Sequence, residues 1–333
     1  MPWDLSPRPL LPPPRPPYRW WLPLPYLALL TFALRWSSIL DVSDVVAAVA
    51  VALGGWLLGL CTWRASGSRY TPWVAGIVYC FCCSAVAVFG RDATTELLAN
   101  GFVIAAWLVA VAPREYGVTY KRESLALTRR HWAAAGLLLG IGSLLHPFVL
   151  VGLLGALGYT RRYYFRRSTQ TRKADWGGVA VTAVTAGVLL PPVGMALATW
   201  LVMDLSWHPL GELHFGRWGQ QLGWLGWYAL YFVPLLLFGM TGFFRNILAS
   251  GRTDFVTVLS TQSWWLTWLI LLFGGGRPEP LVLLHPLVAL QFTESYTATG
   301  VPTHDAKHGF SLLLVLAAGL GVGYYYFAPT FTP

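Results

Sequence analysis

The sequence carries little charge for its length. It has 23 Lys and Arg and 14 Asp and Glu among 333 residues, so 11% of the chain is charged and 56% is hydrophobic. A water-soluble domain has roughly a quarter charged residues, and this composition therefore excludes an ordinary soluble enzyme or binding domain. An ionised side chain in the middle of a bilayer costs about 2.5 kcal/mol or more, so each charge outside a loop needs an explanation.

Cysteine is also scarce, and metal-binding motifs are missing. The four cysteines stand in apolar runs with no His or carboxylate at ligand spacing: Cys61, Cys80, Cys82 and Cys83. They are predicted to be small buried hydrophobic residues. The chain contains neither an HExxH nor a Walker sequence, which are the usual signs of a zinc or nucleotide site. We therefore expect no metal and no cofactor.

Long apolar runs are what the chain has in abundance. A spanning helix needs about 20 mostly apolar residues, and several runs of this kind are bracketed by Trp or Tyr, as at a headgroup boundary. The sequence predicts an all-α fold, a polytopic transmembrane helical bundle of about 9–11 membrane segments. The expected spans are Trp20–Leu40, Val45–Trp63, Thr71–Phe89, Leu97–Ala112, Trp132–Tyr159, Gly177–Met203, Leu222–Met240, Phe255–Phe273, Leu281–Phe292 and Phe310–Phe327.

The first 19 residues differ from the rest of the chain. Ten prolines fall within the first 25 positions, which favours a polyproline-like arm over the apolar segment of a signal peptide. We predict two parts, a proline-rich cytosolic arm over residues 1–19 and a multi-span transmembrane domain over residues 20–333.

The positions of the basic residues predict which side of the membrane each loop faces. If the N-terminus is cytosolic and the run from Trp132 to Tyr159 crosses twice, 19 of the 23 Lys and Arg fall in cytosolic segments. Short cytosolic loops prefer basic residues in this way. The other side keeps only Arg35, Arg91, Arg217 and Arg277.

The double crossing depends on His146-Pro147, in the middle of that run. Proline disfavours helix in the residue before it, so Trp132–Leu145 and Phe148–Tyr159 are predicted to be two short segments that turn there on the non-cytosolic side. A re-entrant hairpin and two full crossings both remain open. The alternative is a single tilted helix with a proline kink.

A set of polar residues that are rare in such a chain collects on the same non-cytosolic side, so any chemistry is expected there: Asp41, Asp44, Arg91, Asp92, Glu96, His146, Asp204, His208, Glu212, His214, Arg217, Arg277 and Glu279. Gly90–Glu96 opens the fourth run, and its Asp92 and Glu96 are four residues apart, which places them on one helix face. Arg91 is able to neutralise one of them. The hypothesis is a polar cluster that faces a lumenal cavity; the alternative is helix capping and charge pairing.

A polar and aromatic loop on this side, residues 207–219, carries further candidates. Its Glu212, His214 and Arg217 stand among Trp and Phe, which suits a sugar or phosphate because Arg holds a phosphate in a fork. An ordinary interfacial loop is the first alternative. A zinc site that also uses His208 is the second.

The segment from Gly274 to Pro280 is predicted to be a tight lumenal turn that presents Arg277 and Glu279. His285-Pro286, just inside the next run, is predicted to be a kinked element with a packing role. On the cytosolic side, the basic run from Arg161 to Lys173 is expected to contact anionic headgroups. The expected partners therefore include membrane lipids and exclude nucleic acid.

From Asp41 onward, the order of these features resembles glycosyltransferase family 22, endoplasmic-reticulum mannosyltransferases of the GT-C type. The family's segment with Arg and Glu after a lumenal span is similar to Gly90–Glu96, and its glycine-rich hairpin is similar to Ala135–Phe148, with His146 where Arg is usual. Its later segments are similar, in the same order, to Pro209–Phe215 with Trp227–Pro234 and then to Arg277–Val282. The branch that builds GPI anchors is the most similar.

One part of the family pattern has no counterpart here. Family members begin with a span and a lumenal His-Pro-Asp-Glu segment, whose acidic residues supply the base. The proline-rich arm stands in its place. Asp41 and Asp44 match a later family position and do not inherit that role.

The resemblance implies a GT-C-like fold, a multi-pass location in the endoplasmic-reticulum membrane, and mannose transfer from dolichyl-phosphate mannose to a lipid-linked glycan, either a GPI anchor precursor or a dolichol-linked oligosaccharide. Arg91 and Arg217, with Arg277 as a further candidate, would lie at the donor phosphate, Asp92 or Glu96 would act as acid/base or positioning groups, and His146 and His214 would lie near the acceptor. The alternative is an inactive or truncated relative that acts as a non-enzymatic membrane subunit. A small-solute transporter is disfavoured because mid-span ionisable residues are almost missing.

Overall fold

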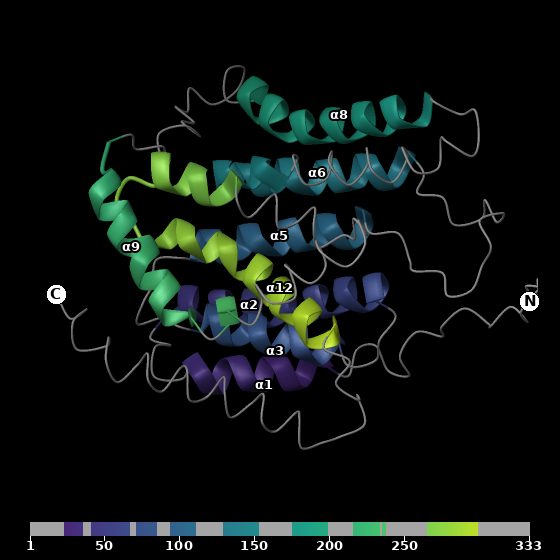
Figure 1. Ribbon diagram of the computed structural model, residues 1–333. Helices are drawn as coiled ribbons and strands as arrows, with labels where there is room; N and C mark the ends of the chain where they lie inside the picture. Colours follow the sequence, from purple (N-terminus) through teal and green to yellow (C-terminus); the bar gives the residue numbers. More distant parts are fainter. Residues whose placement is uncertain are drawn as a thin grey trace, which may run out of the picture.

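The described part of the protein is helical, as the sequence predicts. The computed structural model describes residues 23–35, 41–66, 71–84, 94–110, 129–152, 175–198, 216–233, 235–237 and 265–298. These residues form α-helices and two short 3-10 helices (Figure 1). The predicted arm over residues 1–19 and the predicted span Phe310–Phe327 lie outside this range.

The first three helices pack with alternating directions. α2 (Val42–Ser66) starts at a reciprocal cap, in which Asp41 Oδ1 accepts the Asp44 N–H and the Asp41 N–H donates to Asp44 Oδ2. Such a capping box fixes the first turn of a helix. α3 (Thr71–Cys83) runs antiparallel to α2, with Gly59 against Pro72 and Gly55 against Gly76.

α1 (Pro23–Arg35) runs parallel to α3. Its Leu27 packs on Gly76, and the Nη1 of Arg35 donates a hydrogen bond to the Cys83 carbonyl oxygen at 3.1 Å. The buried Arg35 guanidinium thereby binds a carbonyl at the end of α3, which a helix leaves without an intrahelical donor.

α5 (Thr94–Ala110) and α6 (Arg129–Leu145) form an antiparallel pair, with Gly142 near Ala99 and Phe102. α5 runs parallel to α2, because Arg64 near the end of α2 donates to the Leu108 carbonyl near the end of α5. We call the end of the bundle that holds Arg64 and Leu108 the Arg64 end, and the opposite end, where α6 finishes, the His146 end.

α6 ends at Leu145, and the predicted break at His146-Pro147 is confirmed. His146 is extended (φ −150°, ψ 123°) and caps the 3-10 helix η3 (Pro147–Leu150). α8 (Asp175–Ala198) then packs parallel to α6, with Gly136 opposite Val184 and Gly140 opposite Val188. Because the two helices are parallel, α8 begins at the Arg64 end, as α6 does. The extended His146 excludes a single continuous helix through this position.

The later elements close the His146 end. α9 (Trp218–Tyr231) runs obliquely across this end of the bundle, on the left of Figure 1. The 3-10 helix η5 (Glu279–Leu284) follows Pro278, and α12 (His285–Ala298) starts beside Cys83 at the end of α3. Residues 265–273 are also helical.

Two predicted spans differ from the structure here. The span predicted over Leu222–Met240 begins four residues earlier and lies across the bundle rather than along it, because an apolar face also suits a helix that covers the bundle end. The span predicted over Leu281–Phe292 begins as a 3-10 turn, since Pro280 and Pro286 supply no amide hydrogen for an α-helical bond.

One helix of the described residues is long and apolar enough to cross a bilayer. It comprises Val42–Arg64, with 23 residues and a mean hydropathy of 2.2. Shorter apolar helices cover Pro23–Arg35, Thr71–Cys83, Thr94–Ala110 and Thr182–Leu197.

Candidate functional site

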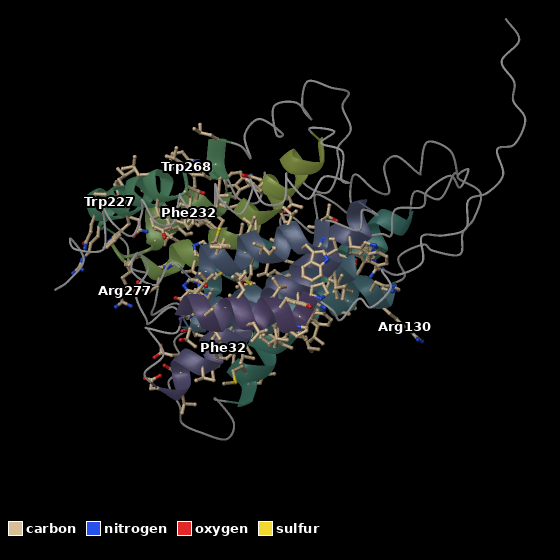
Figure 2. All side chains as sticks on the ribbon, turned by 90° about the horizontal axis from the view of Figure 1, so that it is seen from below. Phe32, Arg130, Trp227, Phe232, Trp268 and Arg277 are labelled. Atoms are coloured by element: carbon tan, nitrogen blue, oxygen red, sulfur yellow. The ribbon has the colours of Figure 1, made fainter. Side chains whose placement is uncertain are left out.

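The ionisable side chains of the described residues are distributed unequally between the two ends of the bundle. Arg64 and Arg130 lie at the Arg64 end, while Asp44, Glu96 and His146 lie at the His146 end together with Arg35, Arg217, Arg277 and Glu279. Figure 2 shows Arg130 and Arg277 at opposite ends of the molecule. The His146 end therefore holds every predicted site residue that the structure describes: Glu96, His146, Arg217, Arg277 and Glu279.

Glu96 and His146 face each other across the α5–α6 contact. His146 Nε2 lies 3.8 Å from Glu96 Oε1, and both residues are buried, with 5% and 8% of their surfaces exposed respectively. The Nδ1 atom of His146 accepts the N–H of Phe148 at 3.3 Å. A neutral imidazole carries one proton, so this bond leaves the hydrogen on Nε2, on the side of the carboxylate.

Burial determines the charge of this imidazole. Desolvation lowers the pKa of His146 to about 4, because an apolar environment disfavours the cation. The side chain is therefore neutral at pH 7. Glu96 stands in the first turn of α5, where the helix dipole favours a negative charge. The pair is a neutral imidazole beside a carboxyl group, at 3.8 Å and therefore beyond hydrogen-bond length.

Arg217 and Arg277 form a second group at the same end. Arg217 precedes α9, and its Cβ is 3.2 Å from the point where a side chain on Gly276 would begin. Gln221, fully buried, accepts the Gly276 N–H at 3.0 Å and donates to the Arg277 carbonyl at 3.2 Å. Gly275 and Gly276 both have positive φ, 67° and 79°, which glycine adopts without strain. The tight turn predicted here is confirmed, and both arginine side chains are exposed.

The buried side-chain amide of Asn100 connects α5, which carries Glu96, to the segment that follows Arg277. The Nδ2 of Asn100 donates to the Val282 carbonyl in η5 at 2.9 Å, and Asn100 is 1% exposed. Asn100 follows Glu96 by one helical turn on α5. η3 and η5 both pack on α5, so this helix fixes where His146 and Glu279 lie relative to Glu96.

The structure also brings together residues that the sequence prediction did not connect. The Sγ of Cys83 lies 3.4 Å from the Nδ1 of His285, and the His285 ring stacks on Tyr228 with an interplanar angle of 16°. Phe232 meets the same imidazole edge to face. The predicted packing role of His285 fits these contacts. The partners themselves could not be predicted from neighbouring residues, because Cys83 lies 202 positions away in the sequence and Tyr228 is on another helix.

Four predicted site residues lie outside the described range: Arg91, Asp92, Glu212 and His214. The zinc alternative with His208 lies there too. Within the described residues, no three His, Cys, Asp or Glu side chains gather so that they could hold a metal ion. The arrangement that is described places two exposed arginines at one turn and a buried carboxyl group beside a buried imidazole at the same end of the bundle.

Comparisons of the chain with family models, curated proteins and solved structures return no match.

Proposed function

We propose that the chain is a multi-span protein of the endoplasmic-reticulum membrane that transfers mannose from dolichyl-phosphate mannose to a lipid-linked glycan on the lumenal side. The observation that carries the proposal is the convergence of Glu96, His146, Arg217 and Arg277 at one end of the bundle, opposite Arg64 and Arg130. A lipid-borne sugar presented at one membrane face requires its reacting groups on that face alone.

The outward surface of the bundle supports a membrane location. α2 exposes an apolar stripe spaced as one helix face: Val42, Val45, Val46, Val49 and Leu53. α8 exposes Leu189, Leu190 and Val193 in the same way. Water is a poor environment for such stripes, and lipid chains are a good one.

In the proposed reaction, an acceptor hydroxyl oxygen attacks the anomeric carbon of the mannosyl phosphate. A new carbon–oxygen bond forms, the bond between the anomeric carbon and the phosphate oxygen breaks, and dolichyl phosphate leaves with the bonding electrons. The hydroxyl proton passes to a carboxylate, Glu96 or Asp92, acting as general base. Arg217, with Arg277 or Arg91, stabilises the negative charge that develops on the phosphate.

His146 has a positioning role near the acceptor in this scheme. Its Nδ1 accepts the Phe148 N–H, and its Nε2 lies 3.8 Å from Glu96 Oε1. A hydroxyl that replaced this contact would accept the Nε2–H and present its own hydrogen to the carboxylate. His214, Glu212 and Glu279 complete the proposed binding set.

A second candidate, a non-enzymatic membrane subunit, is favoured by one observation. Glu96 and His146 are almost fully buried, as expected of a pair that joins α5 to α6 rather than one that meets a substrate. In this case the residues at the His146 end stabilise the bundle and no transfer occurs.

Mannosyl transfer in microsomes separates the two candidates. Wild-type protein, Glu96→Gln and Asp41→Asn are expressed in cells that lack the corresponding mannosyltransferase; Asp41 is an exposed carboxylate at the same end and serves as the matched control. The proposal predicts rescue by wild type and Asp41→Asn. With Glu96 as the general base, Glu96→Gln loses at least 100-fold, on the order of a general-base contribution; with Asp92 as the base, Asp92→Asn shows that loss instead. Equal activity of Glu96→Gln and wild type removes Glu96 from the mechanism, and failure of wild type to rescue favours the subunit.

A further inference from the structure

α9 buries only a narrow stripe of its surface. Gln221 and Tyr228, with Phe232 at the C-cap, pack against the Gly276 turn and His285. Most of the other side chains of the helix are exposed, and none of its residues is Asp, Glu, Lys or Arg. A helix that faces water normally carries charged residues on its exposed side. The exposed surface of α9 is therefore unsuited to bulk water.

The exposed tryptophans of the described residues gather around α9. They have between 37% and 52% of their surfaces exposed and come from α9 and the helical residues 265–273: Trp218, Trp227, Trp265 and Trp268. Figure 2 shows Trp227 and Trp268 at the end of the molecule that also holds Arg277. The large hydrophobic side chains exposed along α2 and α8 contain no aromatic ring. Tryptophan favours the boundary between headgroups and acyl chains, so this difference indicates a membrane boundary at α9.

One flank of α9 is apolar. Trp218, Leu222 and Ala229 are exposed and follow one another at intervals of four and seven residues, which places them on one side of a helix. Leu222 has 56% of its surface exposed. This flank offers an apolar surface to lipid chains.

The opposite flank faces the glycine turn and is polar. The Oε1 of Gln220 lies 2.6 Å from the point where a side chain on Gly276 would begin, and the Nε1 of Trp224 donates to the Gly276 carbonyl oxygen at 3.0 Å. Arg217, which precedes the helix, and Arg277, which follows the turn, are both exposed. The charges next to α9 thus stand on this polar flank.

We infer that α9 is an interfacial helix, which lies in the plane of the membrane surface at the His146 end. Its apolar flank meets the acyl chains of the bilayer, and its polar flank, with Arg217 and Arg277, lies among the phospholipid headgroups. Helices of this kind bury their apolar side about 5–10 Å into the boundary between headgroups and acyl chains. The inference rests on the membrane location in the proposed function, but it does not depend on mannose transfer.

Two other arrangements explain less of α9. A helix that crosses a bilayer needs about 20 mostly apolar residues, whereas α9 has 14 residues and runs across the bundle end. A second copy of the chain on the apolar flank would leave the exposed arginines and the exposed tryptophans of residues 265–273 without an explanation.

Spin-label accessibility of the full-length protein in phosphatidylcholine–phosphatidylglycerol vesicles tests the inference. Single cysteines replace Gln220, Leu222 and Ala229 and carry a nitroxide. The four native cysteines are buried, and the unsubstituted protein serves as the blank. Collision rates with oxygen, which concentrates in hydrocarbon, and with a water-soluble nickel complex on both sides of the membrane give the depth of each label.

The labels on the apolar flank should share one depth. Leu222→Cys and Ala229→Cys are expected to lie about 5–10 Å below the phosphates. They are about 10 Å apart along the helix axis, so a spanning helix would separate their depths by nearly that distance. Gln220→Cys, on the polar flank, should collide with the nickel complex several-fold more often than Leu222→Cys.

Two leucines on the sides of the bundle are the matched controls. Leu53 near the middle of α2 and Leu190 on α8 have 42% and 66% of their surfaces exposed. Labels on Leu53→Cys and Leu190→Cys should both be open to oxygen and closed to the nickel complex. The label on Leu53→Cys should be deeper than the label on Leu222→Cys.

Several results would overturn the inference. A depth difference of about 10 Å between Leu222→Cys and Ala229→Cys would show that α9 spans the bilayer, and nickel access at all three α9 positions would show that it lies in water. Mutual broadening of labels on Leu222→Cys would assign the apolar flank to a second copy, and closure to both reagents would show that protein covers it. If Leu53→Cys stays open to oxygen in these cases, the membrane location stands. Nickel access at Leu53→Cys and Leu190→Cys as well would contradict that location, and with it the proposed function.

Discussion

Close packing of glycine between α6 and α8 gives a prediction whose magnitude follows from the structure. A Cβ on Gly140 would lie 2.6 Å from the Val188 carbonyl oxygen, and one on Gly187 would lie 2.5 Å from the Ala133 carbonyl oxygen. A Cβ on Gly136 would meet the Val184 carbonyl oxygen. Ordinary contacts begin near 3.4 Å, so Gly140→Ala requires the two backbones to separate by about 0.8 Å.

Two opposing effects decide the result. Glycine in a helix interior costs about 0.8–1 kcal/mol relative to alanine, which by itself would make each replacement stabilising. Overpacking against a rigid backbone costs about 1–3 kcal/mol per site. Both added Cβ atoms would meet rigid backbone, so overpacking is the larger effect, and we expect the double variant Gly136→Ala/Gly140→Ala to lose up to about 4 kcal/mol of stability.

Thermal unfolding of purified protein in detergent, followed by tryptophan fluorescence, measures this effect. Gly101→Ala on α5 and Gly194→Ala on α8 are the controls, because nothing lies within 4 Å of an added Cβ at either position. Their Tm should equal or exceed that of wild type, while the double variant unfolds at a lower temperature. A double variant as stable as Gly194→Ala would refute the close backbone contact of α6 with α8 at these glycines.

Three further predictions follow from buried polar contacts. Because burial lowers the pKa of His146 to about 4, the unfolded chain takes up the proton first on acidification; His146 should contribute a fall in stability of roughly 1.4 kcal/mol per pH unit between about pH 6.5 and pH 4, and His146→Asn should reduce the measured slope by that amount. Asn100→Leu leaves the Val282 carbonyl buried without its donor and should cost about 1–3 kcal/mol, seen as a lower Tm; an unchanged Tm would mean that η5 is held by other contacts. All four cysteines are free and buried, so native protein should resist maleimide alkylation while the denatured chain takes four labels; rapid native labelling of Cys83 would contradict its contact with His285.

Local features of the fold were predictable from the sequence. Proline restricts the residue before it, so the break after Leu145 followed from His146-Pro147 alone, and the glycine turn before Arg277 followed from its composition. The apolar runs also indicated helices over Val45–Trp63 and Thr71–Phe89, where the structure has α2 (Val42–Ser66) and α3 (Thr71–Cys83). Each of these conclusions depends on neighbours within one or two helical turns.

Contacts between distant parts of the chain were not predictable. Glu96 and His146 were both candidates, but their pairing depends on the antiparallel contact of α5 with α6. The proximity of Arg217 to Arg277 depends on Gln221, whose buried amide has no signature in the sequence. The prediction of a span over Leu222–Met240 was wrong about the direction of α9, which crosses the end of the bundle. An apolar face indicates that a helix is buried, but it does not identify the surface on which the helix packs.

Sidedness is the central claim, and accessibility of single cysteines tests it most directly. A membrane-impermeant maleimide is added to sealed microsomes that contain Arg130→Cys or Arg277→Cys, in a background whose own cysteines are buried. The account predicts that Arg130→Cys reacts at once, whereas Arg277→Cys reacts only after the membrane is permeabilised. Reaction of both positions before permeabilisation would contradict a lumenal site at the His146 end.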